Sequence, residues 1–405
     1  MSALRSIRLD PVYDSRGRLT VEATVELAGG AVGRAAAPSG ASTSSHEALA
    51  FPEGGVPVAL QRFEALVRPA LKSLEVLNSA GVDRVLHEVD GTPNFSQIGG
   101  NTATAVSVAT ARAAAREQGL PLWKLLARPG VDGRRFPAIV GNCMNGGVHA
   151  TGGPEIQEFI AFAEGSTPTE SIAAVEEVHR RIGIALKAEF PNLALGRGDE
   201  GGWVAPLTSE AAVELLARCC AETRDTLGVP VHPGLDLAAS EFYRGGVYHY
   251  RHRSLDPDGQ FAFLTELVEQ YDLRYIEDPF DQDDWASFAR LTRAAGHRAL
   301  VVGDDLYATR AGRLAEGIRR EATNAVLVKV NQVGTLTDTF ETVDLARARE
   351  IRTVTSHRSG EVPDDWLTHV AVAAGSRGLK CGVLGGERVA KLNELLRLER
   401  GTSQG

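Results

Sequence analysis

Ala325-Val326-Leu327-Val328-Lys329 is a short apolar run that ends in an ionisable residue, and it belongs to a series of such runs that decides the fold. The others are Gly234-Leu235-Asp236, Leu273-Arg274-Tyr275-Ile276-Glu277, Ala299-Leu300-Val301-Val302-Gly303-Asp304 and Ile351-Arg352-Thr353-Val354-Thr355-Ser356-His357. Their terminal polar groups lie 41, 27, 25 and 28 residues apart, which is the length of one βα unit each. This spacing predicts a parallel sheet with crossover helices. Five units in series favour a closed (β/α)8-type barrel over a doubly wound open sheet, whose glycine-rich fingerprint is missing.

The first third of the chain has a different pattern. Residues 20–27 alternate between polar and apolar side chains, a Gly-Gly pair follows, and a second strand-like run covers 32–37, which predicts a hairpin. A polar, glycine-rich loop covers residues 38–45, and the pattern is helical from about 56 to 128. We therefore predict an α/β protein with a small α+β domain over residues 1–130 and a barrel domain that carries the active site over residues 136–405.

Composition and charge exclude several classes of protein. The net charge of -9 argues against a nucleic-acid partner, because phosphate backbones attract basic surfaces. The N-terminus lacks the apolar core of a signal peptide, and no run of about 18 apolar residues could span a membrane. The four cysteines form no CxxC pair, which favours reduced thiols. We expect a cytoplasmic enzyme with no membrane or nucleic-acid partner, and a small phosphorylated substrate is compatible with this charge.

The ionisable residues at the strand ends are expected to meet at the mouth of the barrel, where ligands bind in this fold. They are Asp236, Glu277, Asp304, Lys329 and His357. A single acid at such a position is more often a helix cap or a solvated loop residue, but five consecutive strands that end in this way favour a site. Three carboxylates at one mouth require either a cation or raised pKa values. Oxygen ligands without cysteine or clustered histidine favour Mg²⁺ over zinc.

Lysine is rare in this chain, which has six lysines and 37 arginines. Lys329 and Lys380 lie in strand-like runs, so we infer that an ammonium group is needed there in place of a guanidinium. A lysine beside a bound metal holds its proton less tightly and can act as a general base. The metal can then stabilise the dianion that forms when the carbon next to a carboxylate loses its proton. The alternative is that Lys329 extends to solvent from the end of its strand.

Two glycine-containing loops add candidate groups. Gly198-Asp199-Glu200-Gly201-Gly202 places an acidic pair between glycines, which let the backbone approach a ligand; the alternative is a simple tight turn. Ser356-His357-Arg358-Ser359-Gly360-Glu361 combines a cation, hydroxyl groups and a glycine, a combination suited to a phosphate oxyanion. The alternative is that Ser356 or Ser359 caps a helix.

These motifs, taken in order, resemble the enolase (phosphopyruvate hydratase) family over nearly the whole chain. The remaining matching stretches are Tyr13-Asp14-Ser15-Arg16-Gly17, Pro38-Ser39-Gly40-Ala41-Ser42-Thr43, Asn145-Gly146-Gly147 with His149-Ala150, Gln157-Glu158-Phe159, Ile276-Glu277-Asp278-Pro279-Phe280, Asp304-Asp305-Leu306, Lys329-Val330-Asn331-Gln332 and Ala390-Lys391-Leu392-Asn393. No single motif is decisive, but the ordered series is specific. Enolase-type sites use a lysine or histidine base with one or two Mg²⁺ ions.

The resemblance implies a metal-binding role for four residues. Asp236, Glu277 and Asp304 are expected to bind a first Mg²⁺, and Ser42 is expected to help hold a second. The expected reaction is the reversible dehydration of 2-phosphoglycerate to phosphoenolpyruvate, with two Mg²⁺ ions per site. The resemblance also implies a homodimer or a higher homo-oligomer.

The remaining roles concern the substrate. Lys329 is expected to take the C2 proton, and Glu200 to assist loss of the C3 hydroxyl with Glu158 beside it. His149 and His357 are expected to line the pocket. The residues expected to bind the substrate are Arg358 and Ser359 at the phosphate, Lys380 near the carboxylate, and Gly40, Ala41 and Ser42 in the polar loop.

The chain departs from the family pattern in several loops. Ser44 stands where the family usually has glycine, Asn94-Phe95-Ser96-Gln97-Ile98-Gly99 lacks the usual lysines, and the segment after Lys380 is altered. Because barrel enzymes vary their specificity in such loops, two alternatives stay open beside the glycolytic lyase. One is a transferase of phosphonate biosynthesis, similar to carboxyphosphonoenolpyruvate synthase. The other is a non-catalytic binding protein with the same fold.

Overall fold

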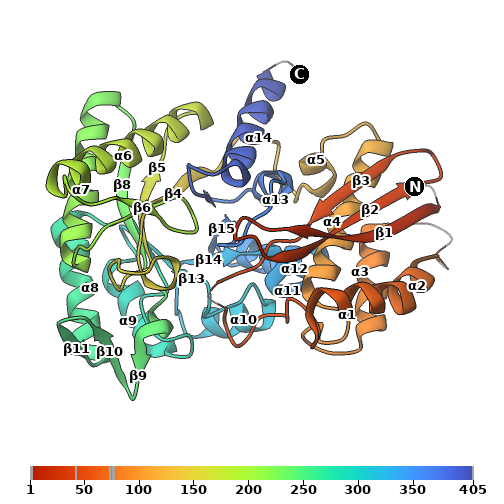
Figure 1. The fold of residues 1–405 in the computed structure, drawn as a ribbon, viewed down its shortest axis with the longest axis horizontal. Coiled ribbons are helices and arrows are strands. Elements are labelled where there is room, and N and C mark those ends of the chain that lie inside the picture. Colours follow the sequence, from red (N-terminus) through yellow and green to blue (C-terminus); the bar gives the residue numbers. More distant parts are fainter. Residues whose placement is uncertain (1–2, 42, 73, 75–77, 404–405) are drawn as a thin grey trace.

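A computed structural model describes residues 3–41, 43–72, 74 and 78–403, which form an N-terminal α+β part and a barrel (Figure 1). The N-terminal sheet contains β1 (Leu4–Tyr13), β2 (Leu19–Leu27) and β3 (Val32–Ala36), all antiparallel. The predicted hairpin is β2–β3 and is confirmed. Strand β1 was not predicted, because charged residues and Pro11 interrupt its alternation.

One helix joins this sheet to the barrel. The N-terminal helices are α1 (Gly55–Arg62), a π-helical turn (Phe63–Val67), α2 (Arg68–Lys72), α3 (Ser79–Asp90), α4 (Gly100–Glu117) and α5 (Leu122–Leu126). Alanine-rich α4 is buried on nearly every face, because it packs between β2–β3 and the short helix α11 (Val330–Val333). Gly33 makes this contact possible, since a Cβ at that position would collide with the backbone of Ala109 and Ala113.

The barrel is closed by eight strands in the order β4, β5, β8, β12, β13, β14, β15 and β16, with β16 paired to β4. Their bounds are β4 (Ala138–Asn145), β5 (Glu158–Ala163), β8 (Val231–Asp236), β12 (Tyr275–Glu277), β13 (Leu300–Gly303), β14 (Ala325–Val328), β15 (Arg352–Ser356) and β16 (Gly378–Lys380). The predicted barrel is thus confirmed. The expected all-parallel sheet is wrong at β5, which is antiparallel to both neighbours. The loop over residues 146–157 that links β4 to β5 contains only a short 3-10 turn (Gly147–His149), so the chain reverses there without a crossover helix.

The barrel interior is a small apolar core of its own. It consists of Ala138, Val140, Ile160, Phe162, Tyr275, Val302, Ala325, Leu327 and Val354. These side chains come from six of the barrel strands and fill the space below the mouth, so the barrel is a packed core and not a pore.

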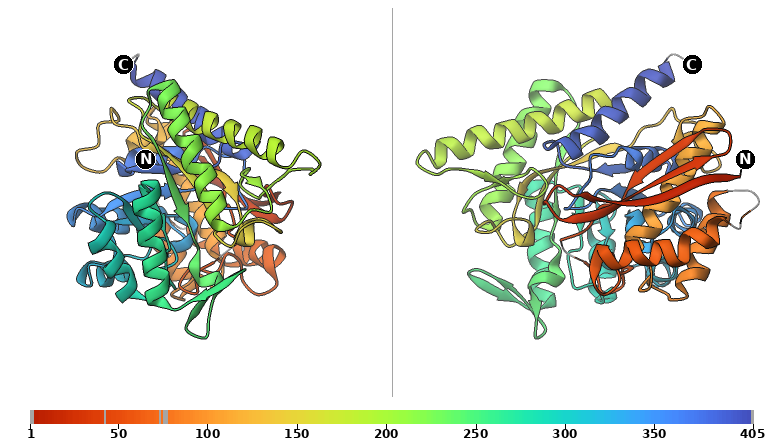
Figure 2. Two further views of the ribbon diagram at one scale, coloured as in Figure 1. Left: turned by 90° about the vertical axis from the view of Figure 1, so that its left-hand side faces the viewer. Right: turned by 45° about the vertical axis from the view of Figure 1, so that its right-hand side comes forward.

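Helices surround the barrel (Figure 1). They are α6 (Pro168–Glu189), α7 (Ser209–Leu227), α8 (Pro257–Tyr271), α9 (Trp285–Ala295), α10 (Ala311–Arg319), α12 (Leu336–Ala348), α13 (Trp366–Ala374) and α14 (Gly386–Ser403). Helix α14 lies along α6 (Figure 2). A short ribbon, β6 (Gly196–Arg197) with β7 (Trp203–Val204), flanks β4, and the sheet β9 (Tyr243–Arg244), β10 (Val247–Tyr250) and β11 (Arg253–Leu255) projects after β8. Within the described ranges, no helix has the length and apolar character needed to cross a membrane.

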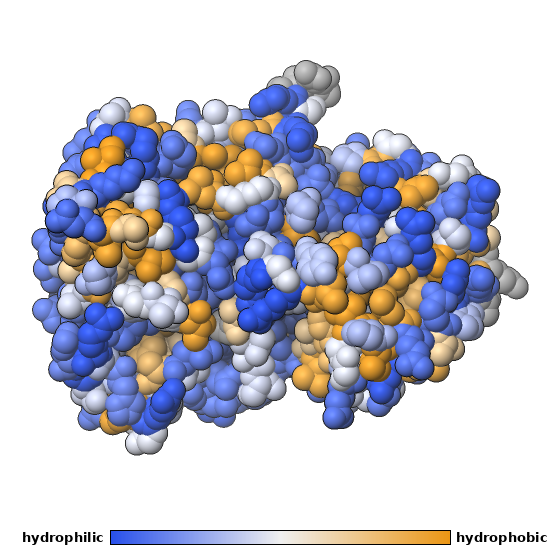
Figure 3. Space-filling view, in the orientation of Figure 1, coloured by the Kyte–Doolittle hydropathy of each residue, from blue (hydrophilic) through white to orange (hydrophobic). Residues whose placement is uncertain are grey.

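The N-terminal part reaches the barrel mouth through its polar loop. Ser39 pairs with Gly360 by two backbone hydrogen bonds of 2.8 Å, and Asn331 Nδ2 donates to Pro38 O at 2.9 Å. Asn101 of α4 donates to Ser39 Oγ at 2.9 Å. Polar contacts therefore fix the start of this loop above the strand ends. On the face shown in Figure 3, apolar residues gather over the N-terminal part, whereas the barrel surface is mixed.

Candidate active site

A small enclosed hollow lies at the barrel mouth. Its lining residues are Gly40, His149, Gln157, Glu158, Glu200, Asp236, Lys329, Ser356, His357, Arg358, Ser359 and Lys380. All but Gln157 and Ser356 are residues that were predicted from the sequence to bind metal or to contact the substrate; those two were quoted only within longer motifs. Of the other predicted residues, Ala41 lies beside the hollow and donates its N–H to Ser359 Oγ at 2.6 Å. Ser42 lies outside the residues that the structure describes, so its predicted role stays a prediction.

Lys380 is surrounded by acids from three strands. Its Nζ lies 2.9 Å from Asp236 Oδ2, 2.8 Å from both carboxylate oxygens of Glu277 and 3.2 Å from Glu158 Oε1. All four side chains are buried. Burial opposes ionisation of Asp236, but the Lys380 ammonium outweighs it and lowers the pKa of that carboxyl. Burial and the nearby Asp236 charge instead raise the pKa of Glu277 to about 8. One ammonium therefore does not fully balance this acidic group.

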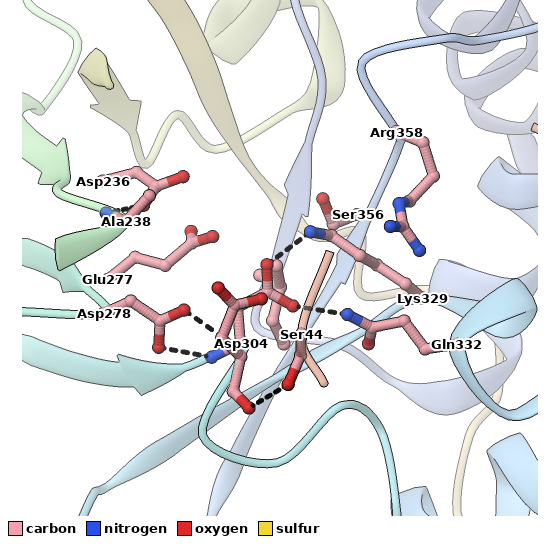
Figure 4. A network of polar contacts seen from close by, with 12 residues as sticks. Ser44, Asp236, Ala238, Glu277, Asp278, Asp304, Lys329, Gln332, Ser356 and Arg358 are labelled. Carbon is pink, nitrogen blue, oxygen red and sulfur yellow. Dashed lines mark hydrogen bonds and ion pairs between the residues drawn. The ribbon is translucent and has the colours of Figure 1, made fainter. Parts of the chain in front are cut away.

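A second ion pair, between Lys329 and Asp304, also lies at the mouth (Figure 4). Lys329, directly after β14, donates to Asp304, directly after β13, and Gln332 Nε2 donates to the other oxygen of Asp304 at 2.9 Å. Burial opposes the charged form of Lys329, yet the Asp304 charge outweighs it and raises the lysine pKa. The contact with Asp304 therefore stabilises the charged ammonium form of Lys329.

The three predicted metal ligands do not form a single tight group in this structure. Asp236 and Glu277 meet at Lys380, whereas Asp304 pairs with Lys329. Among the described residues, the triads whose ligand atoms lie within 4.8 Å of one another are His149–Glu158–Glu200 and Asp278–Asp304–Asp305. The buried acids nevertheless fit a hard divalent cation, because they supply oxygen donors alone. Burial and the neighbouring Asp236 charge both raise the pKa of Glu277, and a bound cation would relieve both effects.

Asp278 braces the end of β13. Its two carboxylate oxygens accept the backbone N–H groups of Asp304 and Asp305 at 2.9 and 2.7 Å. Asp278 itself has a φ of 41°, a left-handed conformation that is strained for an aspartate. The Glu-Asp-Pro sequence after β12 thus fixes the backbone that carries Asp304.

Two glutamates and two histidines occupy the opposite wall. Glu200 Oε2 lies 3.1 Å from His357 Nε2 and accepts from Asn142 Nδ2 at 3.0 Å, while His149 Nδ1 lies 3.8 Å from Glu158 and 3.9 Å from Glu200. Burial, together with the neighbouring Glu200 charge, raises the pKa of Glu158 well above its usual value. Burial also lowers the pKa of His357 to about 4. The neutral imidazole of His357 and the protonated form of Glu158 are therefore favoured. Burial opposes the charged form of Glu200 as well, but His357 and His149 outweigh it and lower the pKa of Glu200 well below its usual value.

The glycine loop places Glu200 in this wall. Gly201 has a φ of 81°, which favours glycine, and a Cβ at Gly198 or Gly202 would collide with the side chain of Asn145. Gly202 N donates to Asn145 Oδ1 at 3.1 Å. The loop is therefore more than a connecting turn, because its tight contact with β4 directs Glu200 into the hollow.

The predicted phosphate contacts lie beneath the N-terminal loop. Arg358 is buried and donates to Glu47 and to Asn331, and Ser359 Oγ accepts from Ala41. Ser356 Oγ donates to the carbonyl of His357 at 2.9 Å. The next helix, α13, begins only at Trp366, so the alternative that Ser356 or Ser359 caps a helix is wrong.

Several organising residues were missed at the level of sequence. Arg388 is fully buried, lies 2.8 Å from His357 Nδ1 and donates to the carbonyls of Arg358 and Ser359, so it holds the loop after β15 in place. Arg388 lies in the altered segment after Lys380. Because this segment departs from the family pattern, Arg388 could not be matched to a family position. Gln332 was quoted within the motif that begins at Lys329, but its contact with Asp304 could not be read from spacing.

Comparison with known proteins gives two family-model matches. The C-terminal TIM barrel domain of enolase matches residues 134–404, and the N-terminal domain of enolase matches residues 4–126. Two relatives named Enolase, from Methanosphaera stadtmanae and Methanothermobacter thermautotrophicus, are each 45% identical over 404 residues. The alignments cover 98% of this chain and 97% and 96% of those proteins. An Enolase from Natronomonas pharaonis is 41% identical over 401 residues, covering 98% of this chain and 99% of its own.

The fold and the site define a barrel enzyme with a lysine and several carboxylates at its mouth. The chain belongs to the enolase family. The resemblance inferred from the motifs is therefore confirmed. The alignments cover nearly the full length of these archaeal relatives. The altered loops therefore do not make this chain markedly shorter or longer than they are.

Proposed function

We propose that this chain catalyses the reversible dehydration of 2-phosphoglycerate to phosphoenolpyruvate and is a lyase of the phosphopyruvate hydratase type. The observation that carries the proposal is the meeting of Lys329, Glu200, Lys380 and Arg358 in one buried hollow of an enolase-family barrel. These groups supply a base, an acid and two fixed cations for a phosphorylated carboxylate. The relatives described above, all named Enolase, act as independent support.

The residues proposed to hold Mg²⁺ are Asp236, Glu277 and Asp304, with Ser42 at a second ion. Bound Mg²⁺ would stabilise the negative charge that accumulates on the substrate carboxylate when C2 loses its proton. Lys380, buried between Asp236 and Glu277, is proposed to add a fixed positive charge next to that carboxylate. The proposal of two ions per site rests on the family, since a divalent cation is supported here only by the excess of buried carboxylates.

Lys329 is proposed to take the C2 proton onto its Nζ. Its position directly after β14 fixes the side chain, and the contact with Asp304 holds Nζ inside the mouth and away from bulk water. The alternative of a lysine that extends to solvent is not favoured, because only 12% of its side chain is exposed. General-base catalysis of this kind contributes about 10²- to 10⁴-fold.

Glu200 is proposed to protonate the departing C3 hydroxyl. A donor must hold a proton when the hydroxyl leaves. Burial alone would raise the pKa of Glu200, but the neighbouring His357 and His149 outweigh it and lower that pKa well below its usual value, so the proton is proposed to reach Glu200 from the neighbouring Glu158, whose pKa is raised. His357 and Asn142 orient Glu200 through contacts of 3.1 and 3.0 Å. Base and acid thus stand on different walls, as an elimination requires of groups acting on C2 and C3.

The two alternatives receive no support from the comparisons. The relatives are named Enolase, and none carries a phosphonate-related name. A non-catalytic protein is also not favoured, because the predicted acids, lysines and histidines that the structure describes lie within one hollow or directly beside it.

We also propose that the protein forms a homodimer or a higher homo-oligomer. Tyr13 and Leu19 pair across β1 and β2, and 67% and 43% of their surfaces are exposed, which is consistent with a homodimer or higher homo-oligomer that covers this edge. Light scattering after size exclusion tests that prediction. The cytoplasmic location and the division into domains at 1–130 and 136–405 remain predictions.

A direct assay tests the proposed reaction. Purified protein with Mg²⁺ and 2-phosphoglycerate should develop the ultraviolet absorbance of an enolpyruvate at a rate of about 1–10³ per second per site, as is ordinary for enzymes. Chelation with EDTA should abolish the signal, and added Mg²⁺ should restore it. A protein that binds Mg²⁺ yet produces no enolpyruvate would overturn the proposal.

A further inference from the structure

A buried ion pair joins the N-terminal part to the predicted phosphate contact. Glu47 follows the polar loop, and its carboxylate faces the Arg358 guanidinium with both oxygens. Arg358 Nη1 lies 2.9 Å from Glu47 Oε2, and Nη2 lies 3.1 and 2.9 Å from Oε1 and Oε2. The side chains are 2% and 7% exposed. Such a two-pronged contact fixes the plane of the guanidinium as well as its position.

Asn331 completes this arrangement. Its Oδ1 accepts from Arg358 Nη1 at 2.9 Å, while its Nδ2 donates to Pro38 O. Glu47 and Asn331 together occupy both N–H groups of Nη1 and at least one of Nη2. The Nε–H group of Arg358 donates to no protein atom among the described residues. The Nε–H group of the guanidinium therefore remains available to donate to an anion, while Glu47 and Asn331 hold the two terminal nitrogens in place.

Glu47 also links the phosphate contact to a proposed magnesium ligand. Gln332 Nε2 donates to Glu47 Oε1 at 3.2 Å and to Asp304 Oδ1 at 2.9 Å. Ser44 N donates to the same Glu47 oxygen at 3.3 Å. One carboxylate thus connects the polar loop, Arg358 and, through Gln332, the acid that pairs with Lys329.

We propose that Glu47 is a positioning residue. It holds the Arg358 guanidinium in the orientation that binds the phosphate group of the substrate. The inference rests on the proposed function, because it takes the ligand of Arg358 to be the phosphate of 2-phosphoglycerate. A carboxylate this close opposes anion binding by its charge. Its contribution must therefore be geometric, since an oriented buried arginine loses less freedom when the anion binds.

Substitution of the carboxylate separates geometry from charge. Glu47→Gln keeps the shape but places an amide N–H₂ against the guanidinium, and Glu47→Asp keeps the charge but is one methylene too short for the two-pronged contact. Asp364→Asn is the matched control, because Asp364 pairs with Arg112 at 2.6 Å and likewise joins the two parts of the chain, away from the hollow.

The measurements are the KM for 2-phosphoglycerate, kcat, and the Kd of inorganic phosphate by titration calorimetry in the presence of Mg²⁺. In Glu47→Gln and Glu47→Asp, KM and the phosphate Kd should both rise by about tenfold or more, with kcat within about threefold of wild type. The phosphate group is bound equally before and during the reaction, so its loss of orientation weakens binding more than turnover. Asp364→Asn should leave all three values unchanged.

Three results would overturn the inference. Tighter phosphate binding in Glu47→Gln would show that the charge of Glu47 dominates. Wild-type behaviour of Glu47→Asp would show that its geometry is irrelevant. A lower unfolding temperature with unchanged KM and phosphate Kd would reduce Glu47 to a brace between the two parts. Failure of the proposed function would give a different result, because the wild-type protein would then show no turnover of 2-phosphoglycerate. In that case the phosphate Kd of the Glu47 variants, measured by calorimetry, would still test the role of Glu47.

Discussion

Lys329 and Asp304 form a largely buried ion pair at the ends of the neighbouring strands β14 and β13. The pair holds the proposed base in its protonated form, because the carboxylate raises the lysine pKa against the effect of burial. On the proposed assignment, removal of the C2 proton by Lys329 would require another group, such as the proposed Mg²⁺, to engage Asp304.

Glu200 should be separable from the base by mutation. In Glu200→Gln the acid is lost while Lys329 and its surroundings are intact, so exchange of the C2 proton with solvent should continue. Formation of phosphoenolpyruvate should fall by about 10²-fold or more, the usual contribution of a general acid. Deuterium incorporation into 2-phosphoglycerate, followed by NMR beside the absorbance assay, checks both. Loss of exchange together with turnover would show that Glu200 acts in the first step.

Ser44 should fasten the polar loop to the barrel. Its buried hydroxyl lies 2.8 Å from Gln282 Oε1 and 2.9 Å from Asp305 O, contacts that the usual glycine could not make. Ser44→Ala should cost about 1 kcal/mol of local stability and increase hydrogen–deuterium exchange in residues 43–49. Ser45→Ala, at an exposed neighbouring position, is the control and should change nothing. Equal exchange in both variants would contradict this role.

Asp83 should give the protein a pH-dependent stability. This carboxylate on α3 is 1% exposed and accepts from the N–H and hydroxyl of Thr337 at the start of α12, at 3.0 and 2.6 Å. Burial raises its pKa from 3.8 to about 6. Because the folded-state pKa is higher than the unfolded one, the stabilising contribution of protonation is complete below pH 4 and is lost as the pH rises through about 6.

Asp83→Asn removes this dependence while it keeps an acceptor for Thr337. The variant should be more stable than wild type by up to about 3 kcal/mol at pH 7 to 8, and the difference should vanish near pH 4. Unfolding temperatures of both proteins across this pH range provide the measurement. A variant that is less stable at neutral pH would show that the charged carboxylate favours the start of α12.

Sequence patterns predicted much of this architecture because the strands that carry the site are buried on both faces and end in single polar groups. The regular spacing from Asp236 to His357 therefore located the barrel and its mouth. The antiparallel direction of β5 could not be predicted. The loop between β4 and β5, residues 146–157, has a composition that suits either a reversal of the chain or a crossover to a parallel strand. Similarly, spacing placed Asp304 and Lys329 near each other but could not show that they pair.

Contacts between residues far apart in the sequence were the main omission. Glu47 and Arg388 lie far in sequence from the groups that they hold, 311 and 31 residues from Arg358 and His357 respectively. Local pattern carries no signal for such pairs, because only the docked loop brings Glu47 to Arg358. The residues proposed to act on the substrate were thus easier to predict than those that position them.

The most direct test of the central claim is the exchange of the C2 proton of 2-phosphoglycerate with deuterated solvent in Lys329→Ala, compared with wild type, in Mg²⁺. The account predicts rapid exchange in wild type and a loss of at least about 10³-fold in the variant, with Mg²⁺ binding still measurable by calorimetry. Exchange that persists in Lys329→Ala at the wild-type rate would contradict the assignment of this lysine as the base.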